Sequence, residues 1–174
     1  EFAFVGKSNC GKSSLLNALL ERKNLPRKSA TPGRTTMINF FSVKLSKEKS
    51  YIFADLPGYG YSKTSKSIKG EWSGLISAYL ERKQIHKILF LFDARRKFEE
   101  FELSYLKFLK KINHEVIIIL TKNDKINRSE SSKKVKELNE LIDKQEIGEL
   151  KVLATSVLKK QGLQELRNEL FLEV

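Results

Sequence analysis

Short, wholly apolar stretches alternate with amphipathic stretches along most of the chain. The apolar stretches have the length and residue types of buried strands, and the amphipathic ones repeat their apolar residues with helical spacing. Strands are predicted at residues 2–5, 88–93, 116–121 and 151–155, and a β-hairpin at 38–45 and 51–54. Helices are predicted at residues 13–20, 71–83, 99–113, 129–144 and 162–172. This alternation predicts an α/β fold with a six-stranded, mostly parallel sheet, one antiparallel strand and about five helices.

Two segments lack this periodicity, residues 21–36 and 56–70, and both are rich in Gly, Pro, Ser, Thr and Lys. Loops of this length inside a compact domain usually serve a function or move. We therefore expect both to be functional. The 174 residues are predicted to form one domain, 1–174.

Composition narrows the class of protein. Hydrophobic residues make up 40% of the chain and charged residues 31%, which argues against disorder along its whole length. The longest apolar runs, 88–92 and 116–120, are much shorter than the roughly 20 residues that cross a bilayer. The single cysteine, Cys10, cannot form an intramolecular disulfide, so we expect a reducing compartment, by default the cytoplasm. Because the sequence begins at Glu1 and not at a methionine, it leaves open whether an N-terminal extension or targeting segment precedes it.

The net charge of +12 favours a polyanionic partner such as RNA, DNA or an anionic membrane surface. A lysine-rich surface that is merely solvated explains the charge equally well.

A phosphate-binding loop follows the first predicted strand and precedes the first helix. Residues 6–13, GKSNCGKS, match the pattern G-x-x-x-x-G-K-[ST]. Such a loop turns its backbone N–H groups towards phosphate oxygens, and the helix dipole adds to their attraction. We expect Lys12 to bridge the β- and γ-phosphates and the Ser13 hydroxyl to bind Mg²⁺. A glycine-rich turn without a ligand leaves both residues unexplained.

Two further segments have the composition of nucleotide switches. Asp55 ends the second hairpin strand and begins the run DLPG, so its carboxylate can reach Mg²⁺ through water and the Gly58 N–H can contact a γ-phosphate. In the preceding loop a threonine hydroxyl can complete the Mg²⁺ coordination only while the γ-phosphate is present. We prefer Thr35 to Thr36, although spacing alone does not decide. Arg34 could contact the phosphates, but a solvated loop arginine is the favoured interpretation.

The run Thr121, Lys122, Asn123, Asp124 follows a predicted strand and matches [NT]-K-x-D. A carboxylate at Asp124 can accept hydrogen bonds from the ring N–H and the exocyclic amine of guanine, and adenine offers no such pair of donors. The stem of Lys122 can lie along the base. The run 155–158, TSVL, ends the last strand, where a backbone N–H could donate to the guanine oxygen.

Over essentially its whole length the chain resembles the TrmE/Era/EngA-type bacterial GTPases, and within them the EngB (YihA/YsxC) family. The resemblance rests on the runs GKSNCGKSSLLNAL, TPGRT followed by NFF, DLPGYGYS, TKND and SVLKKQG. It implies a Ras-like P-loop G domain with Ser13 and Thr35 at Mg²⁺, beside the Asp55 carboxylate already expected there. The nucleotide contacts that it implies are Gly6, Lys7, Ser8, Asn9, Cys10, Gly11, Lys12, Ser13, Gly33, Arg34, Thr35, Thr36, Met37, Asp55, Leu56, Pro57, Gly58, Thr121, Lys122, Asn123, Asp124, Ser156, Val157 and Leu158. It also implies a role in assembly of the large ribosomal subunit and in normal cell division and septation.

Tyr59 stands where many Ras-like GTPases carry the glutamine that orients the attacking water. Hydrolysis is therefore expected to be slow without a partner, on the order of 10⁻⁴–10⁻² s⁻¹. Asn9 matches the position that holds a potassium ion in relatives of this class, although it could simply cap its own loop. The expected catalytic residues are Lys12, Thr35, Gly58 and Asn9. Burial is the favoured fate of the Tyr59 ring.

Two other functions remain open at this point. A P-loop ATPase or kinase shares the phosphate loop, but Asp124 opposes it. A non-hydrolysing RNA- or protein-binding module, in which the nucleotide is only structural, is kept open by Tyr59. In each case we expect a monomer without a membrane span.

Overall fold

A six-stranded sheet with the order β2-β3-β1-β4-β5-β6 forms the centre of the molecule. The computed structural model describes residues 1–20, 37–44, 50–59 and 74–171. The strands are β1 (Phe2–Gly6), β2 (Asn39–Lys44), β3 (Ser50–Asp55), β4 (Lys87–Asp93), β5 (Glu115–Thr121) and β6 (Lys151–Ala154). The pair β2 and β3 is antiparallel, and all other neighbours are parallel. The predicted sheet, with one antiparallel strand, is thereby confirmed.

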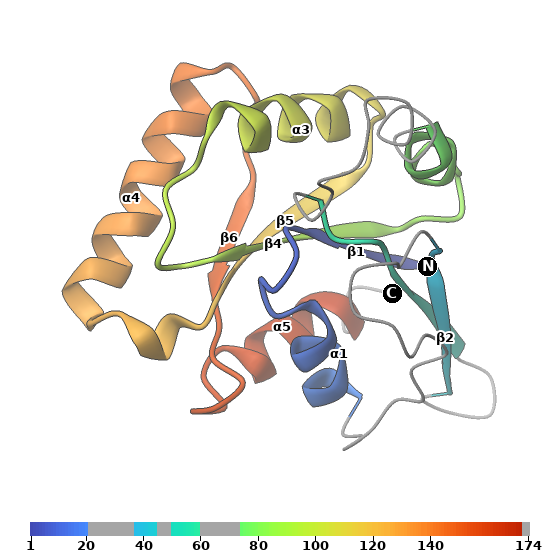
Figure 1. Cartoon of the computed structure of the whole chain (residues 1–174), viewed down its shortest axis with the longest axis horizontal. Coiled ribbons are helices and arrows are strands. Elements are labelled where there is room, and N and C mark those ends of the chain that lie inside the picture. Colours follow the sequence, from blue (N-terminus) through green and yellow to red (C-terminus); the bar gives the residue numbers. More distant parts are fainter. Residues whose placement is uncertain (21–36, 45–49, 60–73, 172–174) are drawn as a thin grey trace.

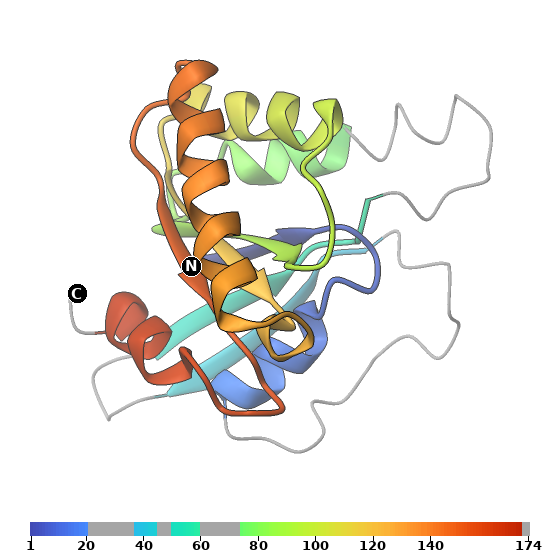
Figure 2. The same cartoon turned by 90° about the vertical axis from the view of Figure 1, so that its left-hand side faces the viewer.

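Helices cover both faces of this sheet (Figure 1). They are α1 (Lys12–Leu19), α3 (Glu100–Lys111), α4 (Arg128–Lys144) and α5 (Leu163–Phe171), with a further helical segment at 74–80. A 3₁₀ turn, η1 (Asn123–Lys125), follows β5 and was not predicted. Helices α3 and α4 lie on one face, and α1 and α5 on the other (Figures 1 and 2). The fold is therefore a three-layer α/β arrangement.

The central strands supply both hydrophobic cores. All seven residues of β4 are buried. Because side chains alternate along a strand, Ile88 and Phe90 enter the core beneath α3, and Leu89 and Leu91 enter the core with α1 and α5. The continuous apolar pattern seen in the sequence is the pattern of a strand buried on both faces.

Local capping explains why the ends of α3 and α4 differ by a residue or two from those predicted; the helix predicted at 71–83 ends three residues early, at residue 80. The Asn127 side chain accepts a hydrogen bond from the Glu130 backbone at 2.8 Å, and the Asn127 backbone donates to the Glu130 carboxylate at 2.9 Å. This capping box starts α4 at residue 128. At the end of α3, Asn113 takes a left-handed conformation, with φ of 60°, and the chain leaves the helix.

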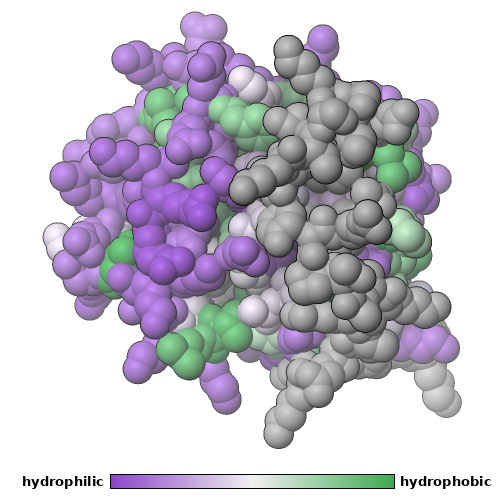
Figure 3. All heavy atoms as spheres, in the orientation of Figure 1, coloured by the Kyte–Doolittle hydropathy of each residue, from purple (hydrophilic) through white to green (hydrophobic). Residues whose placement is uncertain are grey.

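The predicted loop 21–36 lies outside the described residues, as do residues 60–73, which cover most of the second predicted loop and the start of the predicted helix 71–83. None of the described helices is long and apolar enough to cross a membrane. Hydrophilic side chains dominate the part of the surface over α4 in Figure 3.

Candidate functional site

The predicted motifs meet at one edge of the sheet, at the carboxyl ends of the parallel strands. The phosphate loop follows β1, Asp55 ends β3, the TKND run begins at the end of β5, and residues 155–158 follow β6. The strand order reverses direction at β1, which pairs with β3 on one side and β4 on the other. Ligands of open α/β sheets bind at such a point.

The phosphate loop bends sharply between β1 and α1. Asn9 and Gly11 both take left-handed backbone conformations, with φ of 64° and 105°, and the Cys10 N–H donates to the Lys7 carbonyl at 3.1 Å. Gly11 needs this freedom because most other residues avoid such an angle. Cys10 is 3% exposed, and burial raises the pKa of its thiol, so it fills space inside the loop. The loop can therefore offer its backbone, but not the Cys10 side chain, to a ligand.

The N-terminus of α1 suits a polyanion. Among the described residues no side chain caps this helix, and its first turn holds no acidic residue. The first N–H groups of a helix have no intrahelical acceptors and carry the positive end of its dipole. Lys12 Nζ donates to the Gly6 carbonyl at 3.2 Å, which folds the ammonium over the loop. The residues present therefore fit a bound phosphate chain.

The run after β3 packs directly on the phosphate loop. Leu56 N–H donates to the Phe4 carbonyl at 3.1 Å, and Ser8 N–H donates to the Tyr59 carbonyl at 3.0 Å. A Cβ added at Gly58 would lie 2.8 Å from the Ser8 backbone and 3.0 Å from Lys12 Nζ. Only glycine fits this approach. The side chains of Leu56 and Pro57 are buried, so only their backbone is available to a ligand.

Tyr59 turns away from the phosphate loop and into the core, as expected from its sequence position. It is 5% exposed, and its ring centre lies 4.8 Å from that of Phe101 and 6.0 Å from that of Tyr105. Burial, with the nearby Glu102 carboxylate, raises the pKa of the Tyr59 phenol far above its ordinary value. A ring buried among aromatic side chains in this way cannot orient a water beside the phosphates.

The TKND run is tied to the phosphate loop by two side chains. The Thr121 hydroxyl donates to the Cys10 carbonyl at 2.5 Å, and Lys122 Nζ donates to the Asn9 carbonyl at 2.7 Å. Lys122 itself has a left-handed backbone, with φ of 56°. The Asn123 N–H donates to the Thr155 carbonyl at 3.0 Å, and its side chain is buried. Hydrogen bonds therefore connect the TKND run both to the phosphate loop and to Thr155 after β6.

Asp124 is oriented by Ser156. The Ser156 hydroxyl donates to Asp124 Oδ1 at 2.5 Å, and this bond lowers the pKa of the Asp124 carboxyl. The sequence did not indicate this bond; for residues 155–158 it predicted a backbone N–H that donates to the guanine oxygen. The N–H of Thr155 is bound to the Leu120 carbonyl and that of Ser156 to the Gln161 carbonyl, at 2.7 and 3.0 Å. Val157 and Leu158, both exposed, remain the candidate donors to a base.

One charged residue of the site was not identified from the sequence. Asp93 ends β4, is 3% exposed, and binds both Arg95 and Lys122. Burial alone would raise its pKa, but the hydrogen bonds from Arg95 and Lys122 outweigh burial and hold the pKa of Asp93 well below its ordinary value. An acidic residue at the end of a fully apolar strand, on the ligand-binding edge, was the signal that could have identified it.

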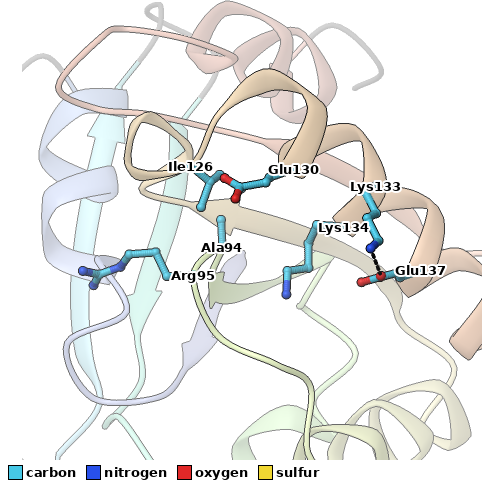
Figure 4. A pocket seen from close by; sticks show the side chains of 7 residues that line it. All are labelled: Ala94, Arg95, Ile126, Glu130, Lys133, Lys134 and Glu137. Carbon is cyan, nitrogen blue, oxygen red and sulfur yellow. Dashed lines mark ion pairs between the residues drawn. The ribbon is translucent and has the colours of Figure 1, made fainter.

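A hollow of about 240 Å³ lies beside the site, between the loop after β4 and α4 (Figure 4). It is lined by Ala94, Arg95, Ile126, Glu130, Lys133, Lys134 and Glu137. Lys133 pairs with Glu137 at 3.8 Å, and Arg95 extends away from the side chains of α4. Because its lining mixes both charges, the hollow does not by itself select a ligand.

Magnesium is compatible with the residues at this edge. Mg²⁺ takes oxygen ligands, usually one or two from the protein and the rest from phosphates and water. Ser13 is exposed at the start of α1, and Asp55 is half-buried opposite Phe4 of β1. No group of three or more His, Cys, Asp or Glu side chains suited to a metal occurs within the described residues. Four predicted contacts, Gly33, Arg34, Thr35 and Thr36, lie outside them, and Met37 is 70% exposed.

Comparison with known proteins shows which family the chain resembles. The family model described as a 50S ribosome-binding GTPase matches residues 1–122. A relative in Clostridium kluyveri, named "Probable GTP-binding protein EngB", is 42% identical over 95% of this chain and 81% of its own length. A relative of the same name in Clostridium acetobutylicum is 40% identical over 98% of this chain and 82% of its own length.

Solved structures show the same fold. A crystal structure of a probable GTP-binding protein engB superposes with a TM-score of 0.74 at 22% identity, over 98% of this chain and 96% of that chain. A structure of Era in complex with MgGDPNP and part of 16S ribosomal RNA superposes with a TM-score of 0.75 at 30% identity. That match covers 97% of this chain and 54% of that chain.

Proposed function

The chain belongs to the EngB family of GTP-binding proteins, within the 50S ribosome-binding GTPases, and we propose that it acts as a GTP-dependent switch in assembly of the large ribosomal subunit. Membership of the family makes it a GTP-binding protein and a GTPase. The proposal adds the partner, which is the large subunit or its precursor, and the residues that read and hydrolyse the nucleotide.

The observation that carries the nucleotide assignment is the link between Asp124 and the phosphate loop. Asp124 is oriented by Ser156, and the adjoining Thr121 and Lys122 are bound to the loop backbone at Cys10 and Asn9. A base held at Asp124 and phosphates held by the loop are thereby kept at a fixed separation. A carboxylate in this place selects guanine because adenine leaves it without two donors.

The chain's own residues would act as follows. The N–H groups at the start of α1 and the Lys12 ammonium bind the β- and γ-phosphates, where they offset the charge that develops during transfer. Ser13, Asp55 and Thr35 would hold Mg²⁺, and the ion would supply charge that neutralises the phosphates. Gly58 presents its N–H to the γ-phosphate from its position against Ser8 and Lys12. The Era structure with MgGDPNP supports the choice of metal.

Hydrolysis by the isolated chain is proposed to be slow, because the buried Tyr59 ring cannot orient the attacking water. A rate on the order of 10⁻⁴–10⁻² s⁻¹ is expected, as for switches that lack their helper. The ribosomal partner then supplies the acceleration, and a potassium ion held by Asn9 is a second source. We place the protein in the cytoplasm as a monomer, and extend its role to normal cell division and septation.

The net charge of +12 supports a ribosomal partner, since binding to nucleic acid is dominated by phosphate contacts. Cosedimentation with large ribosomal subunits tests this part of the proposal, with GTP or GDP present and at increasing salt. Binding that is stronger with GTP and weakens with salt is expected. No cosedimentation in either nucleotide state would reject the ribosomal role.

The nucleotide assignment is tested by calorimetry with GDP, ADP and xanthosine diphosphate. We expect binding of GDP without measurable binding of ADP, and a shift of Asp124→Asn towards xanthosine diphosphate. Asp143→Asn, which makes the same change at an exposed position of α4, is the matched control and should keep the parent's preference. Full GDP affinity in Asp124→Asn would contradict the assigned contact.

The burial of Tyr59 also favours a second candidate, a nucleotide-stabilised RNA- or protein-binding module with little hydrolysis. The two are separated by cosedimentation and turnover measured together. Ribosome binding that is equal with GTP and GDP, with no stimulated turnover, identifies the module. Binding that depends on GTP identifies the switch.

A further inference from the structure

We infer that Asp93 is a positioning residue of the guanine site: its carboxylate holds the Lys122 ammonium where it joins the base-reading loop to the phosphate loop. The inference rests on the proposed nucleotide site and names a residue that none of the nucleotide motifs contains. It also assigns Asp93 a task distinct from that of the nearby Asp124.

Four hydrogen bonds hold the Asp93 carboxylate. Arg95 donates to Oδ1 from its backbone N–H at 3.1 Å and from Nε at 2.9 Å, and to Oδ2 from Nη2 at 2.7 Å. Lys122 Nζ lies 3.0 Å from Oδ2. Asp93 is 3% exposed, and a carboxylate buried to this extent is stable only when it is paired and hydrogen-bonded. The buried Asp93 carboxylate is therefore stabilised by two cationic side chains, those of Arg95 and Lys122.

The same Lys122 ammonium reaches the phosphate loop. It donates to the Asn9 carbonyl at 2.7 Å while it pairs with Asp93, so one side chain connects the ends of β4 and β5 with the loop after β1. A lysine side chain has several rotatable bonds, and fixing them costs conformational entropy. The aliphatic stem can pack along a base only when these bonds are fixed. Pairing with Asp93 fixes the far end of the stem.

Asp93 also decides which carboxylate Lys122 pairs with. Asp124 lies two residues further along the same loop and must keep its oxygens directed towards guanine. It is held by the Ser156 hydroxyl, with Lys125 Nζ at 3.8 Å. A lysine released from Asp93 would be attracted to this second carboxylate, since opposite charges at short range attract strongly where water is scarce. Asp93 therefore keeps Lys122 away from the group that reads the base.

The alternative role for Asp93 is purely structural, because Arg95 alone could satisfy its carboxylate. The two roles differ in what depends on Lys122. If the role is purely structural, substitution of Asp93 weakens GDP binding equally with and without Lys122. If Asp93 positions Lys122, its substitution weakens GDP binding only while Lys122 is present.

The test is a double-mutant cycle on the full chain with Mg²⁺ present, read by the dissociation rate of a fluorescent GDP derivative. Asp93→Asn is expected to accelerate dissociation about tenfold, the factor that loss of one hydrogen bond to a charged group can produce. In a Lys122→Ala background the same substitution should change the rate less than about twofold if the coupling is complete. An equal acceleration in both backgrounds would overturn the inference.

Three further variants keep the test decisive. Arg95→Ala should leave GDP dissociation within about twofold of the parent, because Lys122 keeps its partner, and an effect as large as that of Asp93→Asn would contradict the positioning role. Asp143→Asn repeats the change of charge on the exposed side of α4 and should have no effect. If Asp93→Asn does not fold, Asp93→Glu, which displaces the carboxylate, replaces it in the same cycle.

The outcomes also separate this inference from the proposed function. A parent chain that takes up no GDP would reject the guanine site as a whole. A parent chain that binds GDP, with Asp93→Asn releasing it at the parent's rate, would reject only the role of Asp93.

Discussion

Replacing Thr121 with valine removes the hydrogen bond that ties the guanine-reading loop to the phosphate loop, together with a longer contact of the same hydroxyl, 3.2 Å from the Phe92 carbonyl. Thr121 is 4% exposed, and its hydroxyl donates to the Cys10 carbonyl at 2.5 Å. Valine has nearly the same shape and the same preference for strands, so β5 should be retained. The substitution removes the donor and leaves a buried carbonyl with one hydrogen bond fewer.

The expected magnitude follows from two opposing effects. Leaving a buried polar group without its partner costs about 1–3 kcal/mol. The added methyl group of valine offsets this by up to about 0.8 kcal/mol where its surroundings are apolar. We therefore expect Thr121→Val to lower the free energy of unfolding by about 1–2 kcal/mol.

Thr155→Val is the matched control. Thr155 directly follows the neighbouring β6 and is 1% exposed, but its hydroxyl lies 3.4 Å from the Leu120 carbonyl, too far for a strong bond. The same atoms change in both variants, so the gain from the added methyl group should nearly cancel the small loss at Thr155. We expect Thr155→Val to change the free energy of unfolding by less than about 0.5 kcal/mol.

Urea unfolding of the nucleotide-free chain measures the change in stability. The dissociation rate of fluorescent GDP measures the effect on nucleotide binding. Because part of the lost energy holds the two loops together, Thr121→Val should also release GDP faster, by up to about tenfold for each 1.4 kcal/mol lost. The reasoning is refuted if Thr121→Val and Thr155→Val unfold at the same urea concentration and release GDP at the same rate.

Three further predictions concern the same edge of the sheet. Gly58→Ala should lower the free energy of unfolding and abolish any difference between GTP and GDP in ribosome binding, because its Cβ would lie 2.8 Å from the Ser8 backbone; unchanged stability and nucleotide dependence would contradict the observed packing. Asn9→Ala should remove a stimulation of GTP turnover by potassium over sodium, and equal rates in both salts for parent and variant would exclude the ion. The pKa of Asp93 is held below its unfolded value of about 3.9, so its contribution to stability is complete above that pH and is lost as pH falls towards the folded pKa. Between neutral and acidic pH, the free energy of unfolding measured with urea should therefore fall less in Asp93→Asn than in the parent. An equal fall in both would contradict the pairing of Asp93.

The order and type of the elements could be read from the sequence because they depend on local patterns. A strand buried on both faces is apolar through its middle, as residues 88–92 of β4 are, and a helix with one buried face repeats its apolar residues every three or four positions. The phosphate loop and the TKND run are likewise contiguous, so their chemistry is visible without any tertiary contact. The ends of elements were less accurate, because single capping residues such as Asn127 and left-handed residues such as Asn113 determine them.

The connections within the site depended on the tertiary structure. Lys122 and Asn9 are separated by 113 residues, and Asp124 and Ser156 by 32. No local periodicity relates residues so far apart, since only the parallel pairing of β1, β4, β5 and β6 brings their carboxyl ends to one edge. Burial of the Tyr59 ring was expected from the sequence. Its packing against Phe101 and Tyr105 could not be predicted, because it depends on where α3 lies in the fold. The sequence alone thus determined which chemical groups the protein carries and which nucleotide they suit, and the fold decided which of those groups hold one another in place.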